Sequence, residues 1–361
     1  MPALLELREV EKSFGGTPVL RRLSLAAEEG EVLVLLGASG SGKTTLLRVI
    51  AGFESPDAGR LILGGEEITA LPPARRRFGM VFQHYALFPH LSVAENVAFG
   101  LERHGLDREE RARRVAEALA LVDLDGFEER RVQEISGGQQ QRVAVARALA
   151  PEPTVLLLDE PLSNLDPELR DRTRRELREA IERVGITALW VTHEQQEAFD
   201  VGDRVAILEA GRLAQVGSPE TLYQEPASRF VAGFVGRASF LPAVAADGGT
   251  AILGDERFVG GGARWPAAAV GPLNPGDEVD LMVRPEGVRL VALETPGSLS
   301  GSVLSRRYAG EATFYRVRLD EAGEVVVAAG PEDARPGDRV AVAPRVGGLL
   351  PRAFPRSAGA A

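Results

Sequence analysis

Runs of consecutive apolar residues mark the first two thirds of the chain. Residues 32–36, 155–158 and 188–191 are apolar without alternation, as strands buried on both faces are. Residues 78–83 read as a fourth buried strand, which ends in the polar amide of Gln83. Segments of helical periodicity separate these runs, so the pattern predicts an α/β domain.

Other segments predict antiparallel strands and capped helices. Residues 5–10 alternate between apolar and polar side chains like a half-buried strand, and a second strand is expected over residues 19–27. Asp107 and Asp166 each precede a segment of helical periodicity and suit its capping position. The second of these helices is expected to end at Gly185.

The pattern changes near residue 236. From there on, short apolar strands alternate with turns rich in proline and glycine, which is typical of a small β-barrel or sandwich. A chain of 361 residues also exceeds one ordinary domain. We therefore predict a first domain at residues 1–235, with a helical subdomain at about residues 84–150, and an all-β domain at residues 236–361.

Composition excludes several classes of protein. The formal net charge is −10, and this acidic balance speaks against a protein that coats nucleic acid through its bulk charge. No apolar run approaches the ~20 residues of a membrane-spanning helix, and the N-terminus lacks the pattern of a secretion signal. The absence of cysteine excludes disulfides and thiol catalysis. We expect a cytoplasmic chain that reaches a membrane only through a partner.

A glycine-rich segment joins the first buried run to a helical one. Residues 37–44 read Gly-Ala-Ser-Gly-Ser-Gly-Lys-Thr, which fits the phosphate-loop pattern G-x-x-x-x-G-K-S/T. The backbone N–H groups of such a loop, with the positive end of the following helix, surround phosphate groups. Lys43 is expected to reach the outer phosphates, and the Thr44 hydroxyl to ligate Mg²⁺.

The simpler alternative is a glycine-rich turn that merely joins a strand to a helix. Lysine usage argues against it. Of the 42 basic residues only Lys12 and Lys43 are lysine, so the chain uses arginine almost everywhere else. A compact point charge at this one position suits a phosphate cradle.

Two acids, Asp159 and Glu160, directly follow the buried run at residues 155–158. A carboxylate at this strand end suits Mg²⁺ in phosphate-loop enzymes, which is the role expected of Asp159. Glu160 points elsewhere and is the candidate to polarise an attacking water. A pair of acids that serves solubility is the alternative, but a nearby phosphate loop favours catalysis.

The sequence leaves the roles of two further candidate site residues undecided between two possibilities each. Phe14 lies on a loop near the phosphate loop in sequence, where it could stack on a purine or plug a turn. His193 ends the third buried run, and a histidine there is either a structural hydrogen-bonding group or a catalytic one.

Ser136 and Gln139 are expected to form a capping box at a helix start, which alone explains both residues. Gly137 and Gly138 are less expected there, because each glycine in a helix costs about 1 kcal/mol relative to alanine. A helix start without side chains suits an anion.

The order of these motifs resembles that of the ATP-binding subunit of an ATP-binding cassette (ABC) transporter. The resemblance covers residues 1–235 and implies a P-loop NTPase cassette, in which a mixed sheet carries a helical subdomain. The chain has Phe14 where tyrosine is usual and Ile135 where leucine is usual. The following domain resembles the TOBE, or OB-like, barrel of bacterial importers, and residues 283–286 read Val-Arg-Pro-Glu, a phrase typical of it.

The resemblance implies a role for each motif. The implied ATP-binding residues are Phe14, Gly37, Ala38, Ser39, Gly40, Ser41, Gly42, Lys43, Thr44 and Thr45. The implied Mg²⁺ ligands are Thr44, Gln83 and Asp159, and the implied catalytic residues are Glu160, His193 and Gln83. The signature residues, expected to contact the γ-phosphate held by a second subunit, are Ser136, Gly137, Gly138 and Gln139. Asp166 belongs to a further loop, residues 163–166, of the family pattern.

Partners are implied in the same way. Two copies pair head to tail as a homodimer that buries two ATP molecules. Residues 84–90 correspond to the groove that grips a helix of an integral membrane permease, and a solute-binding protein acts indirectly. The chain is then expected peripherally at the cytoplasmic face of the cell membrane, with no nucleic acid bound.

Residues 234–243 look most like the ferric-iron and polyamine branches, so ATP-driven import of one of these is the favoured function. Importers of sugar, of sulfate or molybdate, or of thiamine are alternatives. A soluble ABC ATPase that acts on nucleic acid or the ribosome is an alternative of another class. Residues 45–135 are too few for the coiled coil of DNA-maintenance members, and each motif occurs once, unlike in ribosomal members. The second domain is a candidate regulatory module.

Overall fold

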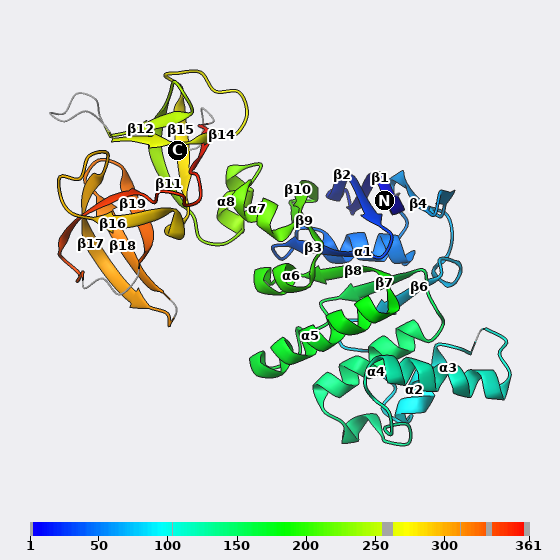
Figure 1. The fold of residues 1–361 in the computed structure, drawn as a ribbon. Helices are drawn as coiled ribbons and strands as arrows, with labels where there is room; N and C mark the ends of the chain where they lie inside the picture. The colour runs from blue at the N-terminus through cyan, green and yellow to red at the C-terminus, as the bar shows by residue number, and fades with distance from the viewer. Residues whose placement is uncertain (1–2, 103, 255–262, 311, 330–333, 357–361) are drawn as a thin grey trace. The chain divides into compact units, whose positions relative to one another are not determined.

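The computed structural model describes residues 3–102, 104–254, 263–310, 312–329 and 334–356 (Figure 1). The chain divides into two compact units, a first unit up to Pro219 and a second unit from Glu220 onward. Among the described residues, no helix is long and apolar enough to cross a membrane.

A six-stranded sheet with the order β10-β9-β3-β8-β7-β6 forms the centre of the first unit. Its strands are β3 (Val32–Gly37), β6 (Phe78–Val81), β7 (Val155–Asp159), β8 (Thr187–Thr192), β9 (Arg204–Glu209) and β10 (Arg212–Gly217). All neighbours pair in parallel except β10, which is antiparallel to β9. Every residue of β3 and β8 is buried, as expected for uninterrupted apolar runs.

A smaller antiparallel sheet has the order β2-β1-β4-β5. Its strands are β1 (Ala3–Phe14), β2 (Thr17–Glu28), β4 (Ala58–Leu63) and β5 (Glu66–Glu67). Helix α1 (Lys43–Ala51) shares one hydrophobic core with strands of both sheets. The antiparallel strands predicted before the phosphate loop are therefore present. They pack against one side of α1.

Five more helices complete the first unit: α2 (Val93–Phe99), α3 (Arg108–Leu121), α4 (Gly137–Leu149), α5 (Pro167–Val184) and α6 (Gln195–Val201). Short 3₁₀ turns occur at Pro73–Arg75 and Val132–Glu134. Helices α2, α3 and α4 pack on one another beside β6, and Figure 1 shows them grouped apart from α1. All three helices lie within residues 84–150, the range expected for a helical subdomain.

The helix boundaries follow the predicted caps. The Asp107 carboxylate accepts a hydrogen bond from the Glu110 N–H at 2.9 Å, and the Asp166 carboxylate accepts one from the Leu169 N–H at 3.0 Å. Gly185 ends α5 in the left-handed conformation, with φ at 68°. Capping residues therefore set where α3 and α5 begin and where α5 ends.

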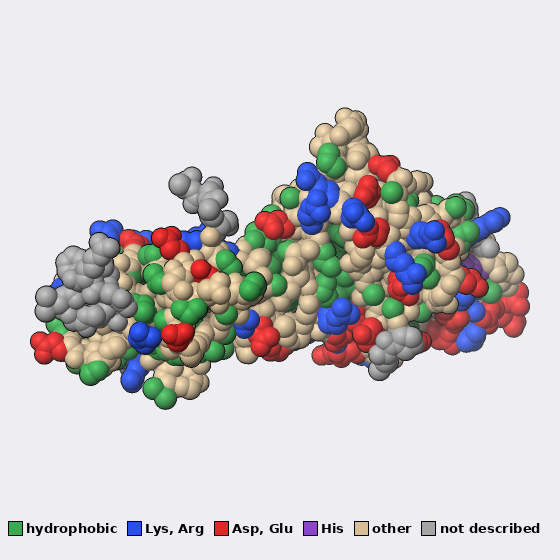
Figure 2. Space-filling model, turned by 90° about the horizontal axis from the view of Figure 1, so that it is seen from above, with side chains coloured by type: hydrophobic (Ala, Val, Ile, Leu, Met, Phe, Trp, Pro, Cys, Tyr) green, Lys and Arg blue, Asp and Glu red, His purple; other side chains and the backbone are tan. Residues whose placement is uncertain are grey.

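Surface charge on the first unit is mixed. On α3, Arg113 forms ion pairs with Glu110 and Glu117. Figure 2 shows acidic and basic side chains interspersed over much of the face seen there, with acidic side chains gathered toward one end.

The second unit is built from two sheets around a core in which Trp265 and Tyr315 are fully buried. One sheet has the order β13-β12-β11-β15-β21-β14, and the other has the order β16-β20-β17-β18-β19. Its strands are β11 (Ser239–Ala246), β12 (Thr250–Leu253), β13 (Ala263–Pro266), β14 (Ala268–Ala269), β15 (Glu278–Val283), β16 (Val288–Val291), β17 (Leu299–Tyr308), β18 (Thr313–Leu319), β19 (Gly323–Ala329), β20 (Arg339–Pro344) and β21 (Arg352–Pro355). The predicted all-β character is confirmed.

Two short helices, α7 (Pro219–Gln224) and α8 (Arg229–Phe234), precede these strands. Arg284, which is 2 % exposed, holds them by donating hydrogen bonds to the carbonyls of Tyr223, Ala232 and Val235 at 2.9, 3.1 and 2.6 Å. The Tyr223 hydroxyl in turn donates to Glu286 at 2.6 Å. The Val-Arg-Pro-Glu phrase at residues 283–286, which includes the 3₁₀ turn Pro285–Gly287, therefore has a structural role inside the second unit.

Candidate active site

The phosphate-loop pattern lies where it was predicted, between β3 and α1. Gly40 and Gly42 have φ values of 79° and 101°, a region that residues with side chains rarely adopt. A Cβ atom on Gly37 would lie 2.6 Å from the carbonyl oxygen of Leu208, so the approach of β9 also requires glycine there. Because Gly42 caps α1 without a side chain, the start of the helix is open to an anion.

Lys43 lies back over this loop. Its Nζ donates hydrogen bonds to the carbonyl oxygens of Gly37 at 2.8 Å and of Ala38 at 3.1 Å. Burial lowers the pKa of Lys43, while Glu160 and Asp159 raise it. The lysine is therefore positioned between the loop backbone and the two acids.

Ser41 provides an unused donor in the same loop. Its Oγ is buried and has no hydrogen-bond partner among the described residues. Buried polar atoms in proteins are almost always paired, so an unpaired one needs a reason. A phosphate oxygen in the loop would supply the missing acceptor.

Asp159 is the last residue of β7, the neighbour of β8 in the sheet, and Glu160 follows it. Burial, and secondly the charge of Glu160, raise the pKa of Asp159, whereas Arg48 and Lys43 lower it. Burial therefore disfavours the charged form of Asp159. A cation beside this carboxylate would favour the charged form.

Glu160 has an unusual backbone. Its φ is 44°, in the left-handed region, and its N–H donates to the Val191 carbonyl at 3.0 Å. Such conformations in residues other than glycine cost about 1–3 kcal/mol and cluster at functional sites. The Glu160 Oε2 lies 3.1 Å from the Nδ1 of His193, which follows β8. The sheet edge thus brings two predicted catalytic residues into contact.

Gln83 and the loop at residues 163–166 are also joined. The Asn164 amide donates to the Gln83 carbonyl at 2.5 Å and lies 3.2 Å from the Nδ1 of His84. The Ser163 hydroxyl donates to the Glu160 carbonyl at 2.9 Å. This loop therefore connects the segment after β6 to the acid that follows β7. Its last residue, Asp166, caps α5.

The signature segment forms the predicted capping box. The Gln139 side chain accepts from the Ser136 N–H at 2.9 Å, and Ser136 Oγ accepts from the Gln139 N–H at 3.4 Å. A Cβ atom on Gly138 would lie 2.9 Å from Thr173 Oγ1 of α5, and one on Gly137 would lie 3.2 Å from Leu165. Close packing is therefore a second reason for these glycines, which the sequence did not reveal.

Phe14 ends β1 and remains 45 % exposed. The Lys12 Nζ lies 5.2 Å from the centre of its ring. A ring that plugged a turn would be buried, so this one is available to stack on a flat ligand.

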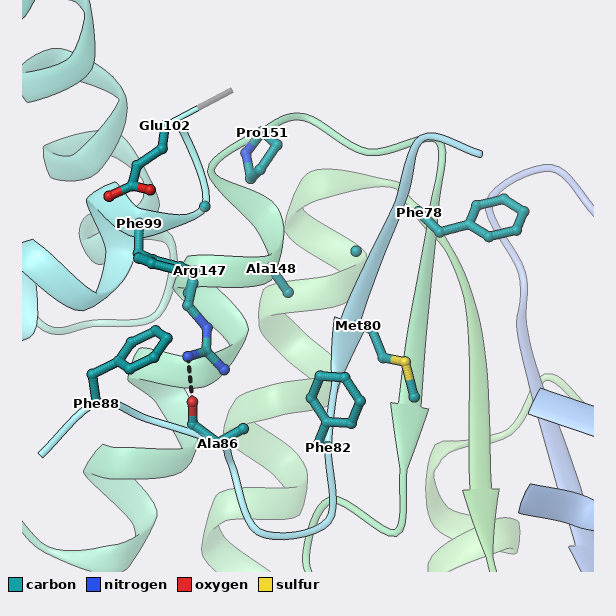
Figure 3. A pocket seen from close by; sticks show the side chains of 12 residues that line it. Phe78, Met80, Phe82, Ala86, Phe88, Phe99, Glu102, Arg147, Ala148 and Pro151 are labelled. Atoms are coloured by element: carbon teal, nitrogen blue, oxygen red, sulfur yellow. Dashed lines mark hydrogen bonds between the residues drawn. The ribbon is translucent and has the colours of Figure 1, made fainter. Parts of the chain in front are cut away.

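An aromatic groove of about 540 Å³ lies beside β6, next to the segment that follows Gln83. Phe82, Phe88 and Phe99 line it, and Figure 3 shows their rings around the guanidinium group of Arg147. Phe82 and Phe99 are 38 % and 44 % exposed. The groove is therefore open and apolar, which is typical of a protein-binding surface.

Arg147 shapes this groove from α4. Its guanidinium donates to the carbonyls of Tyr85 and Ala86, both at 2.6 Å, and these two residues have φ values of 59° and 50°. Buried Asn96 holds the segment after β6 at Phe88. Its side-chain amide accepts a hydrogen bond from the Phe88 N–H and donates one to the Phe88 carbonyl. Neither residue was predicted from the sequence. Arg147 is one arginine among many, and no local pattern marks it.

The phosphate loop, the acid pair and the strand-end histidine define a P-loop nucleotide-binding cassette. The family model for the ABC transporter matches residues 20–163, and that for the TOBE domain matches residues 281–349. The chain belongs to the ABC transporter family, in which it is an ATP-binding subunit with ATPase activity. The predicted α/β cassette followed by a TOBE domain is thereby confirmed.

Individual relatives match both units. The spermidine/putrescine import ATP-binding protein PotA 1 of Pseudomonas aeruginosa is 48 % identical over 333 residues, covering 90 % of this chain and 89 % of that protein. The Fe(3+) ions import ATP-binding protein FbpC of Brucella melitensis is 44 % identical over 337 residues, covering 93 % of each. Among solved structures, cbiO1 from Clostridium perfringens, part of the ABC transporter complex cbiONQ, matches with a TM-score of 0.58 and 31 % identity, covering 62 % of this chain and 92 % of that one.

Proposed function

We propose that this chain hydrolyses ATP to energise a bacterial importer of polyamine or ferric iron. The observation that carries the proposal is the similarity to a spermidine/putrescine and a ferric-iron import subunit over about nine tenths of the chain. By the family pattern the cassette comprises residues 1–235, and residues 236–361 form the domain that follows it. The last two short helices of residues 1–235, α7 and α8, belong to the second compact unit. The identity of the cargo rests on the relatives alone.

ATP binds with its phosphates in the loop at residues 37–44 and its adenine on Phe14. The loop supplies backbone N–H groups, the open start of α1 and the charge of Lys43. Thr44, Asp159 and Gln83 offer hydroxyl, carboxylate and amide oxygens, the donor types that Mg²⁺ prefers. These residues would hold the ion, which neutralises phosphate charge during transfer.

Glu160 and His193 carry the hydrolysis. A water oxygen attacks the γ-phosphorus in line with the leaving ADP oxygen, and Glu160 orients this water and accepts its proton. His193, at 3.1 Å, fixes the carboxylate in place. Lys43 stabilises charge on the phosphate oxygens.

The site is completed by a second copy. Ser136, Gly137, Gly138 and Gln139 of one subunit contact the γ-phosphate held by its partner, and Asp166 lies in the loop at residues 163–166 that faces this partner. The open helix start of α4 suits that role, because its first two residues carry no side chain. Two ATP molecules are then buried in a symmetric homodimer.

The aromatic groove beside β6 receives the permease. A short helix with one apolar face would bury Phe82, Phe88 and Phe99, which are otherwise partly exposed to water. The subunit is thereby held at the cytoplasmic face of the membrane, and a solute-binding protein acts through the permease.

Co-purification tests this assignment. The Glu160→Gln chain serves as bait in cells of its own source, with ATP and mild detergent, and Lys43→Ala is the control that cannot hold ATP. We expect a polytopic membrane protein, with a solute-binding protein, to be enriched by the first bait. Loss of polyamine or ferric-iron uptake on deletion of the gene then identifies the cargo. Recovery of ribosomal or DNA-bound proteins instead would contradict the importer assignment.

A further inference from the structure

We infer that Arg170 is a positioning residue for hydrolysis, because it ties the loop at residues 163–166 to the segment that carries His193. The inference rests on the proposed function, which places this loop at the partner subunit. Arg170 lies in the first turn of α5 and is absent from the predicted site.

The guanidinium group of Arg170 has two acceptors on different loops. Its Nη1 donates to the Glu194 carboxylate at 2.5 Å, and its Nη2 donates to the Leu165 carbonyl at 2.9 Å. A guanidinium is a planar fork with fixed geometry, so the two acceptors are held at a fixed spacing. A lysine ammonium lacks this fixed fork, so it would not hold the two acceptors at a set spacing.

These contacts complete a closed ring that begins and ends at Glu160. Ser163 donates to the Glu160 carbonyl, and two residues later the Leu165 carbonyl accepts from Arg170. Arg170 then binds Glu194, whose neighbour His193 returns to the Glu160 carboxylate. Removal of Arg170 opens this ring while leaving the phosphate loop untouched.

The segment that carries His193 is held on its strand side as well. The Thr192 hydroxyl accepts from the Glu194 N–H at 3.0 Å and donates to the buried carboxylate of Glu197 at 2.7 Å. Glu197 also accepts from the Trp190 indole at 2.6 Å. These contacts fix the residues on both sides of His193 to β8 and α6, whereas Arg170 fixes them to the loop that faces the partner.

An ordinary surface ion pair is the competing explanation, since exposed pairs contribute little. The same helix offers one for comparison: Arg172 lies 2.8 Å from Glu176 and is 72 % exposed. The Arg170 side chain is only 21 % exposed, and one of its two acceptors is a backbone carbonyl. Arg172 is therefore a matched control on the same element.

The test compares Arg170→Ala, Arg170→Lys and Arg172→Ala in the full chain. We expect Arg170→Ala to lower kcat about 10- to 100-fold, because an ångström of misplacement at a reacting centre has effects of this size. The Kd for ATP should stay within about twofold of the wild-type value, because Arg170 makes no phosphate contact. Arg170→Lys should recover part of the rate, and Arg172→Ala should match the wild type. An unchanged kcat in Arg170→Ala would overturn the inference.

A second comparison separates positioning from general damage. If Arg170 acts through His193, then Arg170→Ala in a His193→Ala background should lower the residual rate less than twofold. If Arg170→Ala lowered the rate in that background by the same factor as in the wild type, the inference would be overturned. Glu194→Gln provides the same comparison should Arg170→Ala fold poorly, since it keeps an acceptor but loses the charge. None of these assays includes a permease, so failure of the importer assignment would be seen separately, in the co-purification.

Discussion

The Nδ1 of His193 lies 3.1 Å from the Oε2 of Glu160, although the two residues follow different strands. The contact exists because β7 and β8 are parallel neighbours, whose carboxyl ends meet at one edge of the sheet. Glu160 also has a left-handed backbone at this point. Sheet order thus brings a carboxylate and an imidazole from distant parts of the chain together.

Replacing Glu160 by glutamine removes the candidate base. We expect Glu160→Gln to lower kcat about 10²- to 10⁴-fold, the usual contribution of a positioned general base. ATP should bind normally, and a closed dimer should accumulate in size-exclusion chromatography. The exposed Glu66→Gln is the control, with an expected rate equal to the wild type. A near-normal rate in Glu160→Gln would remove this residue from the proposed role.

Replacement of Lys43 by alanine is expected to weaken the binding of ATP. The compact charge over the phosphate loop is lost, so we expect the Kd for ATP to rise by at least about tenfold. Isothermal titration calorimetry on the full chain measures this change. The exposed Arg60→Ala is the control for the loss of one cation. Tight ATP binding by Lys43→Ala would show that the loop works in another way.

Replacing Phe14 by alanine tests the stacking role. Base stacking on an aromatic ring contributes about 1–3 kcal/mol, so ATP should bind roughly 5- to 150-fold more weakly. Phe14→Tyr should bind ATP as the wild type does, because the ring is kept. Inorganic tripolyphosphate has no base, and its affinity should be the same for all three chains. Equal weakening of ATP and tripolyphosphate binding would argue for damage to the loop.

The raised pKa of Asp159 predicts a pH dependence of stability. A carboxyl whose pKa is raised on folding stabilises the folded state fully below its unfolded pKa, which is about 3.9 for aspartate. That contribution is lost as pH rises through the higher pKa of the folded chain. Asp159→Asn should therefore have a larger free energy of unfolding than the wild type at pH 7, and the two should converge near pH 4.

Urea unfolding of the nucleotide-free protein measures this difference. Emission of Trp190, in a Trp265→Phe background, reports on the first unit alone. The exposed Asp125→Asn should follow the wild type at every pH. Parallel pH profiles for Asp159→Asn and the wild type would contradict the prediction.

The hydrogen bonds of Arg284 predict that its replacement destabilises the second unit alone. Arg284→Ala leaves the carbonyls of Tyr223, Ala232 and Val235 without their donor, so we expect a loss of about 2–4 kcal/mol. Emission of Trp265 in a Trp190→Phe background follows unfolding of this unit. The exposed Arg289→Ala is the control and should change stability by less than about 0.5 kcal/mol. An equal loss in both variants would mean that the buried contacts are unimportant.

The central strands could be predicted because their burial leaves a direct mark on composition. A run such as residues 32–36 is apolar without alternation only when both faces are covered. Helices α3 and α5 were predicted from their caps and apolar stripes. Helix α2 was missed, although Ser92 and Glu95 form a capping box before it, because its seven residues are too few for a clear period.

The residues of the candidate site were predicted because each belongs to a short motif that can be recognised from neighbouring residues in the sequence. The contacts between motifs could not be predicted in this way. Arg147 binds backbone carbonyls of a distant loop, and Arg170 binds the carboxylate of Glu194. Any arginine can make such contacts wherever the fold brings an acceptor near. Gly138 is similar, because its packing against Thr173 depends on the crossing of α4 and α5.

The position of Lys43 has one consequence for the affinity of the site. Its ammonium group donates to the carbonyls of Gly37 and Ala38, which belong to the same loop whose N–H groups suit phosphate. If Lys43 binds phosphate as proposed, each binding event exchanges a contact within the protein for one with the ligand. The net free energy of ATP binding is then smaller than the lysine–phosphate contact alone would supply.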